Sequence, residues 1–171
     1  MWEGPIGRDL NLKAHSKDLR LNRSKDSEAT FFVTKSLYPK KPLLDAKLRN
    51  KIVSSFAHGV RNDRIHLASF VVMPDHWHAL LAPRAPWTLP KFVHAMMTFV
   101  ARGDRPNEKE LSWQDGYHDT KIKTAKQFAY VVNYIEQNPV KKGLVENSAD
   151  WKASSAAQPD LLTDPWPYQY D

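Results

Sequence analysis

The stretch IHLASFVVMPDHWHALLAP, residues 65–83, contains two apolar runs separated by a short turn at residues 73–75. Residues 65–72 are rich in β-branched and aromatic side chains, and residues 76–82 are apolar apart from two histidines. Runs of this length on either side of a proline-containing turn are typical of adjacent antiparallel strands. The stretch therefore predicts a hairpin, and the rest of the fold is assigned outward from it.

The segments on either side of this hairpin predict two further strands and three helices. They are strand 29–38, helix 43–60, helix 89–102, a weaker strand within 111–122, and helix 125–138. Gly59 is expected to close the first helix and Pro139 to stop the last. The order β-α-β-β-α-β is the ferredoxin-like pattern, in which two helices cover one face of an antiparallel sheet. We therefore predict an α+β fold of this type with an additional C-terminal helix.

The composition is that of a folded chain of one domain. The sequence has 171 residues, of which 42% are hydrophobic and none is cysteine. The absence of cysteine excludes a disulfide framework and thiolate metal sites. Apolar runs are far shorter than the roughly 20 residues of a membrane span, and the first residues lack the order of a signal peptide. We expect a cytoplasmic protein with no membrane partner, associated with the nucleoid when it binds DNA.

Charge is distributed unevenly along the chain. The whole chain carries a formal charge of +6 and residues 146–171 carry −4, so residues 1–145 carry +10. A basic body suits a polyanion such as nucleic acid, although a solvated basic surface gives the same composition. We divide the chain into an N-terminal arm (1–28), a domain (29–145) and an acidic C-terminal tail (146–171).

The two histidines in the second strand of the hairpin raise a chemical question. Side chains alternate along a strand, so His76 and His78 are expected on one face and Trp77 on the other, where a helix can cover it. Neutral imidazoles on one face can share a metal ion, and a buried imidazole needs some partner for its ring nitrogens. An H-x-H spacing also arises by chance, so the spacing alone leaves a metal site and an ordinary strand pair both open.

The last predicted helix offers further ligands and a nucleophile. Tyr134 and Asn138 are four residues apart and lie on one helical face, so a helix across the sheet can present both to the imidazoles. Each also has a plain structural explanation, Tyr134 as an amphipathic core aromatic and Asn138 as a helix C-terminal residue. Geometry alone also allows Tyr130, one turn earlier, as a nucleophile.

The two motifs together resemble a known family. MPDHWHALL (73–81), followed about fifty residues later by YIEQNPVKKGLV (134–145), is similar to the motifs of single-tyrosine HUH transposases of the insertion-sequence-200-like superfamily. Within that superfamily it resembles the branch associated with repetitive extragenic palindromes (REP), the RAYT proteins. The resemblance covers most of the chain, from about residue 29 to about residue 157. Asp75 stands where the family usually has Asn, and Lys141 and Lys142 replace Arg-Ala.

This resemblance implies a mechanism and a set of roles. The residues matching His76 and His78 bind a divalent cation, Mg²⁺ or Mn²⁺, and the residue matching Asn138 completes the site. The residue matching Tyr134 attacks single-stranded or hairpin DNA, giving a 5′-phosphotyrosine and a free 3′-hydroxyl that can reverse the step. The family includes monomers and homodimers, and both states stay open here.

Two other functions and several secondary residues stay open from the sequence. A metal-dependent nuclease would use the histidines without the tyrosine, and a domesticated nucleic-acid-binding protein would have no catalysis. Five lysines flank the proposed site and are candidate phosphate contacts: Lys121, Lys123, Lys126, Lys141 and Lys142. His118 is a candidate proton acceptor or extra ligand, which we leave out of the metal site. Trp87 and Trp113 suit core packing better than base stacking.

Overall fold

The structure is a computed structural model that describes residues 29–40, 42–102 and 112–163. Its main elements are β1 (Phe31–Ser36), α2 (Ala46–Arg61), β2 (Ile65–Val72), β3 (His76–Pro83), α3 (Leu89–Ala101), β4 (His118–Lys121) and α4 (Ala125–Lys141). Two short 3-10 helices follow, η2 (Ser148–Asp150) and η3 (Pro159–Leu161). No helix within these described ranges is both long and apolar enough to cross a membrane.

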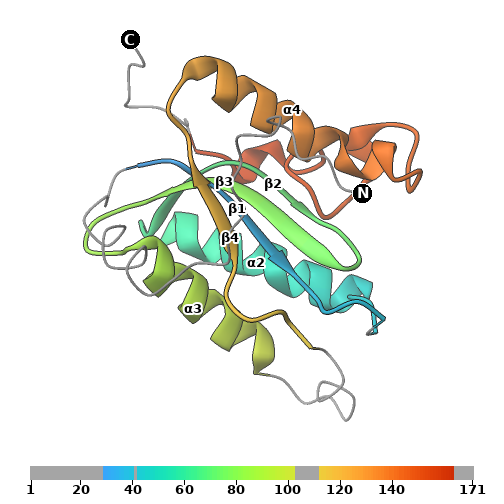
Figure 1. The fold of residues 1–171 in the computed structure, drawn as a ribbon, viewed down its shortest axis with the longest axis horizontal. Coiled ribbons are helices and arrows are strands. Elements are labelled where there is room, and N and C mark those ends of the chain that lie inside the picture. The colour runs from blue at the N-terminus through green and yellow to red at the C-terminus, as the bar shows by residue number, and fades with distance from the viewer. Residues whose placement is uncertain (1–28, 41, 103–111, 164–171) are drawn as a thin grey trace.

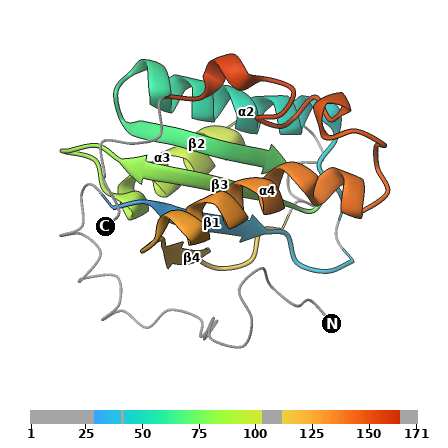
Figure 2. The same ribbon diagram turned by 90° about the horizontal axis from the view of Figure 1, so that it is seen from above.

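The four strands form one sheet in the order β2-β3-β1-β4, and every neighbouring pair is antiparallel. Each of the two β-α-β crossovers skips one strand, and this confirms the predicted ferredoxin-like pattern. Figure 1 shows α2 and α3 on one side of the sheet and α4 on the other, and Figure 2 shows α4 running across the strands. The additional helix is thus the cover of the second face.

The alternation along β3 sorts its side chains between these two layers. Trp77 is fully buried on the α2 side, where its ring meets that of Phe56 edge-on with the centroids 5.5 Å apart. The prediction that a helix covers Trp77 is therefore confirmed. The opposite face carries a smaller apolar cluster in which Val71 and Leu80 of the sheet pack with Val131 of α4. That cluster holds α4 against the sheet beside the two histidines.

The sequence predicts that Gly59 closes α2, and this prediction is wrong, because the helix continues to Arg61. A Cβ atom at Gly59 would lie 2.7 Å from Cε2 of Phe92 on α3 and 3.2 Å from Cδ1 of Ile65. The glycine therefore serves close packing of α2 against α3 and β2, which sequence periodicity alone does not distinguish from a helix end.

Pro139 does not stop α4 either, because the helix runs through it to Lys141. A proline this near a helix end removes one hydrogen bond without breaking many turns. The helix is terminated instead by Gly143, two residues beyond its last residue, which has φ +67°. The N–H of Gly143 donates to Val140 O, and the N–H of Leu144 donates to Pro139 O. This pair of bonds is a Schellman motif, for which glycine is the favoured residue.

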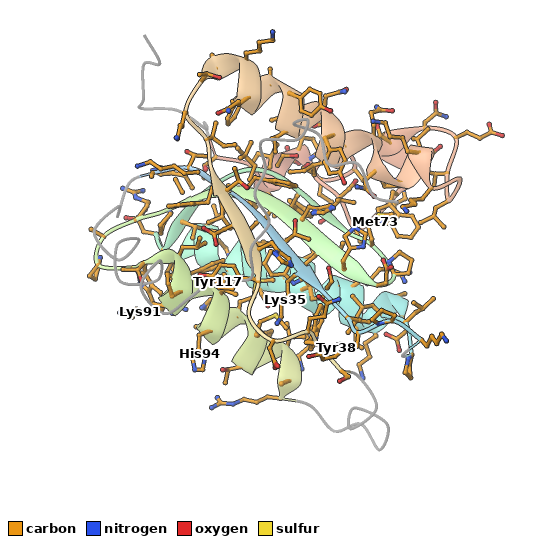
Figure 3. The ribbon with its side chains drawn as sticks, viewed as in Figure 1. Lys35, Tyr38, Met73, Lys91, His94 and Tyr117 are labelled. Carbon is orange, nitrogen blue, oxygen red and sulfur yellow. The ribbon has the colours of Figure 1, made fainter. Side chains whose placement is uncertain are left out.

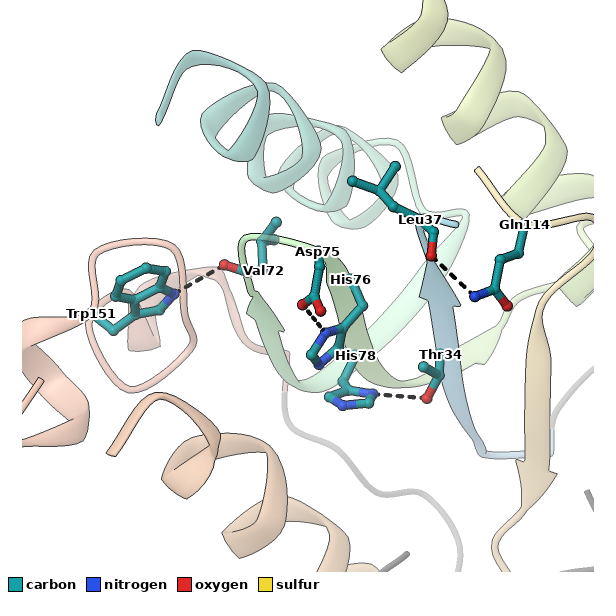
Figure 4. Close-up of polar contacts among 8 residues, drawn as sticks. All are labelled: Thr34, Leu37, Val72, Asp75, His76, His78, Gln114 and Trp151. Carbon is teal, nitrogen blue, oxygen red and sulfur yellow. Dashed lines mark hydrogen bonds and ion pairs between the residues drawn. The ribbon is translucent and has the colours of Figure 1, made fainter. Parts of the chain in front are cut away.

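The chain after α4 returns to the sheet and covers the outer edge of β2. Val72 N–H donates to Ala153 O at 2.8 Å, and Ser155 N–H donates to Phe70 O at 2.9 Å. The indole of Trp151 donates to Val72 O at 3.0 Å (Figure 4). Residues 151–155 belong to the segment that the sequence analysis assigns to the acidic tail. They form hydrogen bonds with backbone N–H and C=O groups of an edge strand that would otherwise be open to pairing with another chain.

Truncation after residue 147 is expected to lower the free energy of unfolding by about 3–5 kcal/mol, because it strips buried contacts and edge hydrogen bonds from β2. Denaturant unfolding followed by circular dichroism measures this. The matched control ends after residue 163 and keeps every contact described above. Equal stability of the two truncated chains would contradict the expectation and would support the division at residue 146, which stays a prediction.

Candidate active site

Two imidazoles lie side by side at the start of β3, on the face that α4 covers. The ring centroids of His76 and His78 are 4.6 Å apart. Across the sheet, Ser36 and Thr34 of β1 are their partners in register. The alternation predicted from the sequence therefore places both histidines on one face, as Figure 4 shows.

His78 is the buried member of the pair, with 2% of its surface exposed. Its Nδ1 atom shares a hydrogen bond with the Thr34 hydroxyl at 2.8 Å, whereas its Nε2 atom is buried with no hydrogen-bond partner among the described residues. Burial holds the pKa of His78 well below its usual value, the neighbouring His76 acts in the same direction, and Asp75 opposes them. His78 is therefore a neutral imidazole with one bare ring nitrogen.

His76 is oriented by the residue that precedes it. Its Nδ1–H donates to Asp75 Oδ1 at 2.6 Å. This hydrogen bond is the main cause that lowers the pKa of Asp75, and the charges of His76 and Lys142 add to it against the effect of burial. A carboxylate that accepts from one ring nitrogen leaves the lone pair on the other, the arrangement that metal-bound histidines adopt.

Tyr134 reaches the histidines from α4. Its ring centroid is 5.4 Å from that of His78 and 6.0 Å from that of Phe32, whose ring is in turn 5.3 Å from His78. Phe32 is thus the common support of the imidazole and the phenol. Tyr130, one turn earlier, has 47% of its surface exposed and makes no ring contact with the pair within the described ranges. The geometry distinguishes two tyrosines that helical spacing alone left equivalent.

Asn138 follows Tyr134 by one turn of α4 and is 5% exposed. Its Oδ1 atom is buried with no hydrogen-bond partner in the described part of the chain. Buried polar atoms are normally paired, so the Nε2 atom of His78 and the Oδ1 atom of Asn138 are each available to a ligand. The described residues contain no group of three His, Cys, Asp or Glu side chains that could hold a metal ion, so the amide of Asn138 is a candidate third ligand beside the two histidines.

The five candidate lysines fall into two groups. The ammonium of Lys141 lies 5.8 Å from the centroid of the Tyr134 ring, and Lys142 is close enough to Asp75 to lower its pKa. The others precede Tyr134 by eight residues or more, about 12 Å along a helix for the nearest of them. These are Lys121 in β4, Lys123 after it, and Lys126 in the first turn of α4. Only the first group adjoins the site.

The remaining sequence candidates lie outside the cluster. His118 is opposite Thr34 in the β1–β4 pair, so it lies one strand further from His78 on the same face. Another histidine of the chain, His94, is exposed on α3, which covers the other side of the sheet. Trp87 and Trp113 are partly buried and pack against the larger core cluster, as expected for both.

Sequence reasoning missed the residues that orient the site. In the sequence Asp75 stands out only as a departure from the family motif, although an acid directly before a histidine is a usable signal for a residue that orients the imidazole. Thr34 and Phe32 carried no usable signal, because their roles depend on the register between β1 and β3, which a single sequence does not specify.

The sequence of the chain is similar to those of known proteins. The family model described as "Transposase IS200 like" matches residues 31–138, from the first residue of β1 through Asn138. A REP-associated tyrosine transposase of Escherichia coli (strain K12) is 30% identical over 105 residues, which are 56% of this chain and 58% of that protein. The match thus spans little more than half of that relative.

A solved structure has a similar fold. The structure of a REP-associated tyrosine transposase bound to a REP hairpin superposes with a TM-score of 0.64 and 20% sequence identity. The superposition covers 85% of this chain and 88% of that one. At this level of identity the likeness establishes a shared fold.

Proposed function

The chain belongs to the family of IS200-like transposases, and from this premise we propose that it cleaves and rejoins single-stranded DNA through a covalent bond to Tyr134. One observation carries the proposal. The phenol of Tyr134 and the imidazoles of His78 and His76 form a continuous row of ring contacts at 5.4 and 4.6 Å. A nucleophile beside a pair of imidazole nitrogen donors is an arrangement suited to metal-assisted phosphoryl transfer.

The donor set fits a divalent cation. His76 and His78 would hold it through their ring nitrogens, and the amide oxygen of Asn138 would complete the protein's share, since the bare atoms on His78 and Asn138 need a partner. Two imidazoles suit Mn²⁺ better than Mg²⁺, which prefers oxygen ligands. A cation bound there would supply Lewis-acid stabilisation of negative charge on the scissile phosphate.

The chain's own residues perform the transfer. Oη of Tyr134 attacks phosphorus, the bond from phosphorus to the 3′-oxygen breaks, the phenol loses its proton and the 3′-oxygen gains one. The products are a 5′-phosphotyrosine and a free 3′-hydroxyl, so the bond energy is kept and the reverse step rejoins the strand. A phenol has a pKa near 10. The ammonium of Lys141, 5.8 Å from the ring centroid, places a positive charge beside the phenol.

The DNA partner we propose is a hairpin with an unpaired flank. The similar protein of known structure is bound to a REP hairpin, and the basic body of this chain suits the same class of ligand. Tyr134 contacts His78 of its own chain, which supports a site that works in cis. A homodimer is not required for the chemistry, and the oligomeric state stays a prediction.

Covalent trapping tests this function. The full chain is incubated with Mn²⁺ and 5′- or 3′-labelled hairpin oligonucleotides taken from DNA flanking its gene. We expect a protein–DNA adduct that survives boiling in detergent, carries only the label 3′ of the cut, and is accompanied by a shorter strand ending in a 3′-hydroxyl. Adding excess 3′-hydroxyl strand should release the adduct as a joined product.

Two other outcomes would replace the proposal. Cleavage without any adduct would indicate the metal-dependent nuclease, because a water nucleophile leaves no covalent bond to the protein. Salt-sensitive binding without cleavage, on every hairpin and with either metal, would indicate a non-catalytic DNA-binding protein.

A further inference from the structure

A cavity of about 320 Å³ lies between α2 and α3, on the side of the sheet away from Tyr134. Phe92 and Met96 of α3, each 3% exposed, are among the residues that line it. Phe99 also lines it, and 51% of its surface is exposed to solvent. The volume is at the lower end of small-ligand pockets, about 300–1,000 Å³. The cavity thus combines a buried apolar floor with an accessible aromatic ring.

Two arginines belong to the polar part of the lining. Arg61 at the end of α2 and Arg64 directly before β2 both line the cavity, together with His58 and two serines. Neither arginine forms an ion pair with a carboxylate in the described part of the chain, and the neighbouring Asp63 is already paired with Arg84. The guanidinium of Arg64 lies 4.4 Å from the centroid of the Trp87 ring, a contact that holds it in place without neutralising it.

The surrounding layer has the same sign. Helices α2 and α3 contain no Asp or Glu. Lys91 and His94 lie along α3, as Figure 3 shows, and the ammonium of Lys51 lies 5.3 Å from the centroid of the Phe99 ring. The two helices that line the cavity thus carry basic and no acidic side chains, and the ligand of the cavity is expected to be anionic.

We propose that this cavity binds one unpaired base of single-stranded DNA, with Phe99 against the base and Arg61 and Arg64 on the adjoining phosphates. Cationic side chains interleaved with an exposed aromatic ring are the usual means of holding single strands. A duplex keeps its bases stacked and paired, so it cannot fill the apolar floor. This proposal depends on the proposed function in one respect, namely that the ligand is single-stranded DNA.

The position of the cavity gives this contact a separate role. Figure 1 shows the sheet between α4, which carries Tyr134, and the helices α2 and α3, which line the cavity. The base held here is therefore not at the bond being cut. The contact would anchor a flanking part of the strand, and it should raise affinity for unpaired DNA without entering the chemical step.

The test measures DNA binding in EDTA, where no cleavage occurs, using an oligothymidylate with one central 2-aminopurine and no hairpin. Phe99→Ala is expected to lower affinity at least about fivefold and to abolish the fluorescence change of 2-aminopurine, because a stacked base is lost. Arg61→Gln/Arg64→Gln is expected to lower affinity at least about tenfold and to reduce the slope of log affinity against log salt by about 1.4. If the double variant fails to fold, Arg61→Gln alone should give about half of that change in slope.

The controls separate the cavity from general charge. Lys47→Gln/Lys152→Gln removes the same charge from exposed positions that do not line the cavity, and its affinity should stay close to that of the unmodified chain. Unchanged affinity in the cavity variants would overturn the proposal. An effect of the arginines but not of Phe99, equal binding of duplex, or equal competition by an acidic peptide would also overturn it, since each indicates attraction without a bound base.

The result is distinguishable from that of covalent trapping. If the unmodified chain forms the adduct and the cavity variants bind oligothymidylate normally, only the cavity proposal fails. If the cavity variants lose binding although no hairpin yields an adduct, the proposed transposase chemistry fails and the cavity proposal stands.

Discussion

Replacing Tyr134 with phenylalanine is expected to abolish the covalent protein–DNA adduct and to reduce strand cleavage by at least about a thousandfold. The change removes one oxygen atom and leaves the ring, which contacts His78 and Phe32, in place. The variant should therefore fold normally and bind DNA with the affinity of the unmodified chain. The measurement is detergent gel analysis of labelled hairpin with Mn²⁺, together with binding by fluorescence anisotropy.

Tyr130→Phe is the matched control for this prediction. It makes the same chemical change on the same helix, one turn away, at a ring that is 47% exposed. We expect its adduct yield to equal that of the unmodified chain. An adduct that persists in Tyr134→Phe and disappears in Tyr130→Phe would move the nucleophile to the earlier turn. Cleavage that is unaffected by either substitution would eliminate a tyrosine nucleophile altogether.

The order of the elements could be predicted from the sequence because each has a strong local pattern. Residues 65–72 and 76–82 were expected as a hairpin and form β2 and β3 within one residue of those bounds. The helical face shared by Tyr134 and Asn138 was likewise a matter of spacing within one element. Local periodicity determines such features before any tertiary contact forms.

The features that the sequence did not predict depend on contacts between distant segments. Gly59 and Pro139 are read locally as helix ends, but tertiary packing and the Gly143 terminus decide otherwise. The bond between Thr34 and His78 requires the register of β1 on β3. The strand-like return of residues 151–155 along β2 comes from a segment with no periodic pattern of apolar side chains. Each is a consequence of pairing across many residues, which composition and spacing do not encode.

Replacing His78 with glutamine is expected to remove the tight Mn²⁺ site, weakening binding by more than about a hundredfold. The bare Nε2 atom of His78 is the buried donor of the pair, and a carboxamide offers a weaker donor at a different position. The measurement is the electron paramagnetic resonance signal of free Mn²⁺ during titration. The unmodified chain should take up one equivalent before the free signal rises, and the variant should show no such lag.

Two further variants make this prediction decisive. His94→Gln changes an exposed histidine on α3, so it should bind Mn²⁺ as the unmodified chain does. Asp75→Ala removes a carboxylate that is 64% exposed and orients His76 through a 2.6 Å bond. It should weaken binding by about 10- to 100-fold without affecting the fold, even if His78→Gln proves unstable. The metal site would be refuted if the unmodified chain bound no Mn²⁺, or if Asp75→Ala and His78→Gln both bound it with unchanged affinity, because the cation would then have ligands other than this pair.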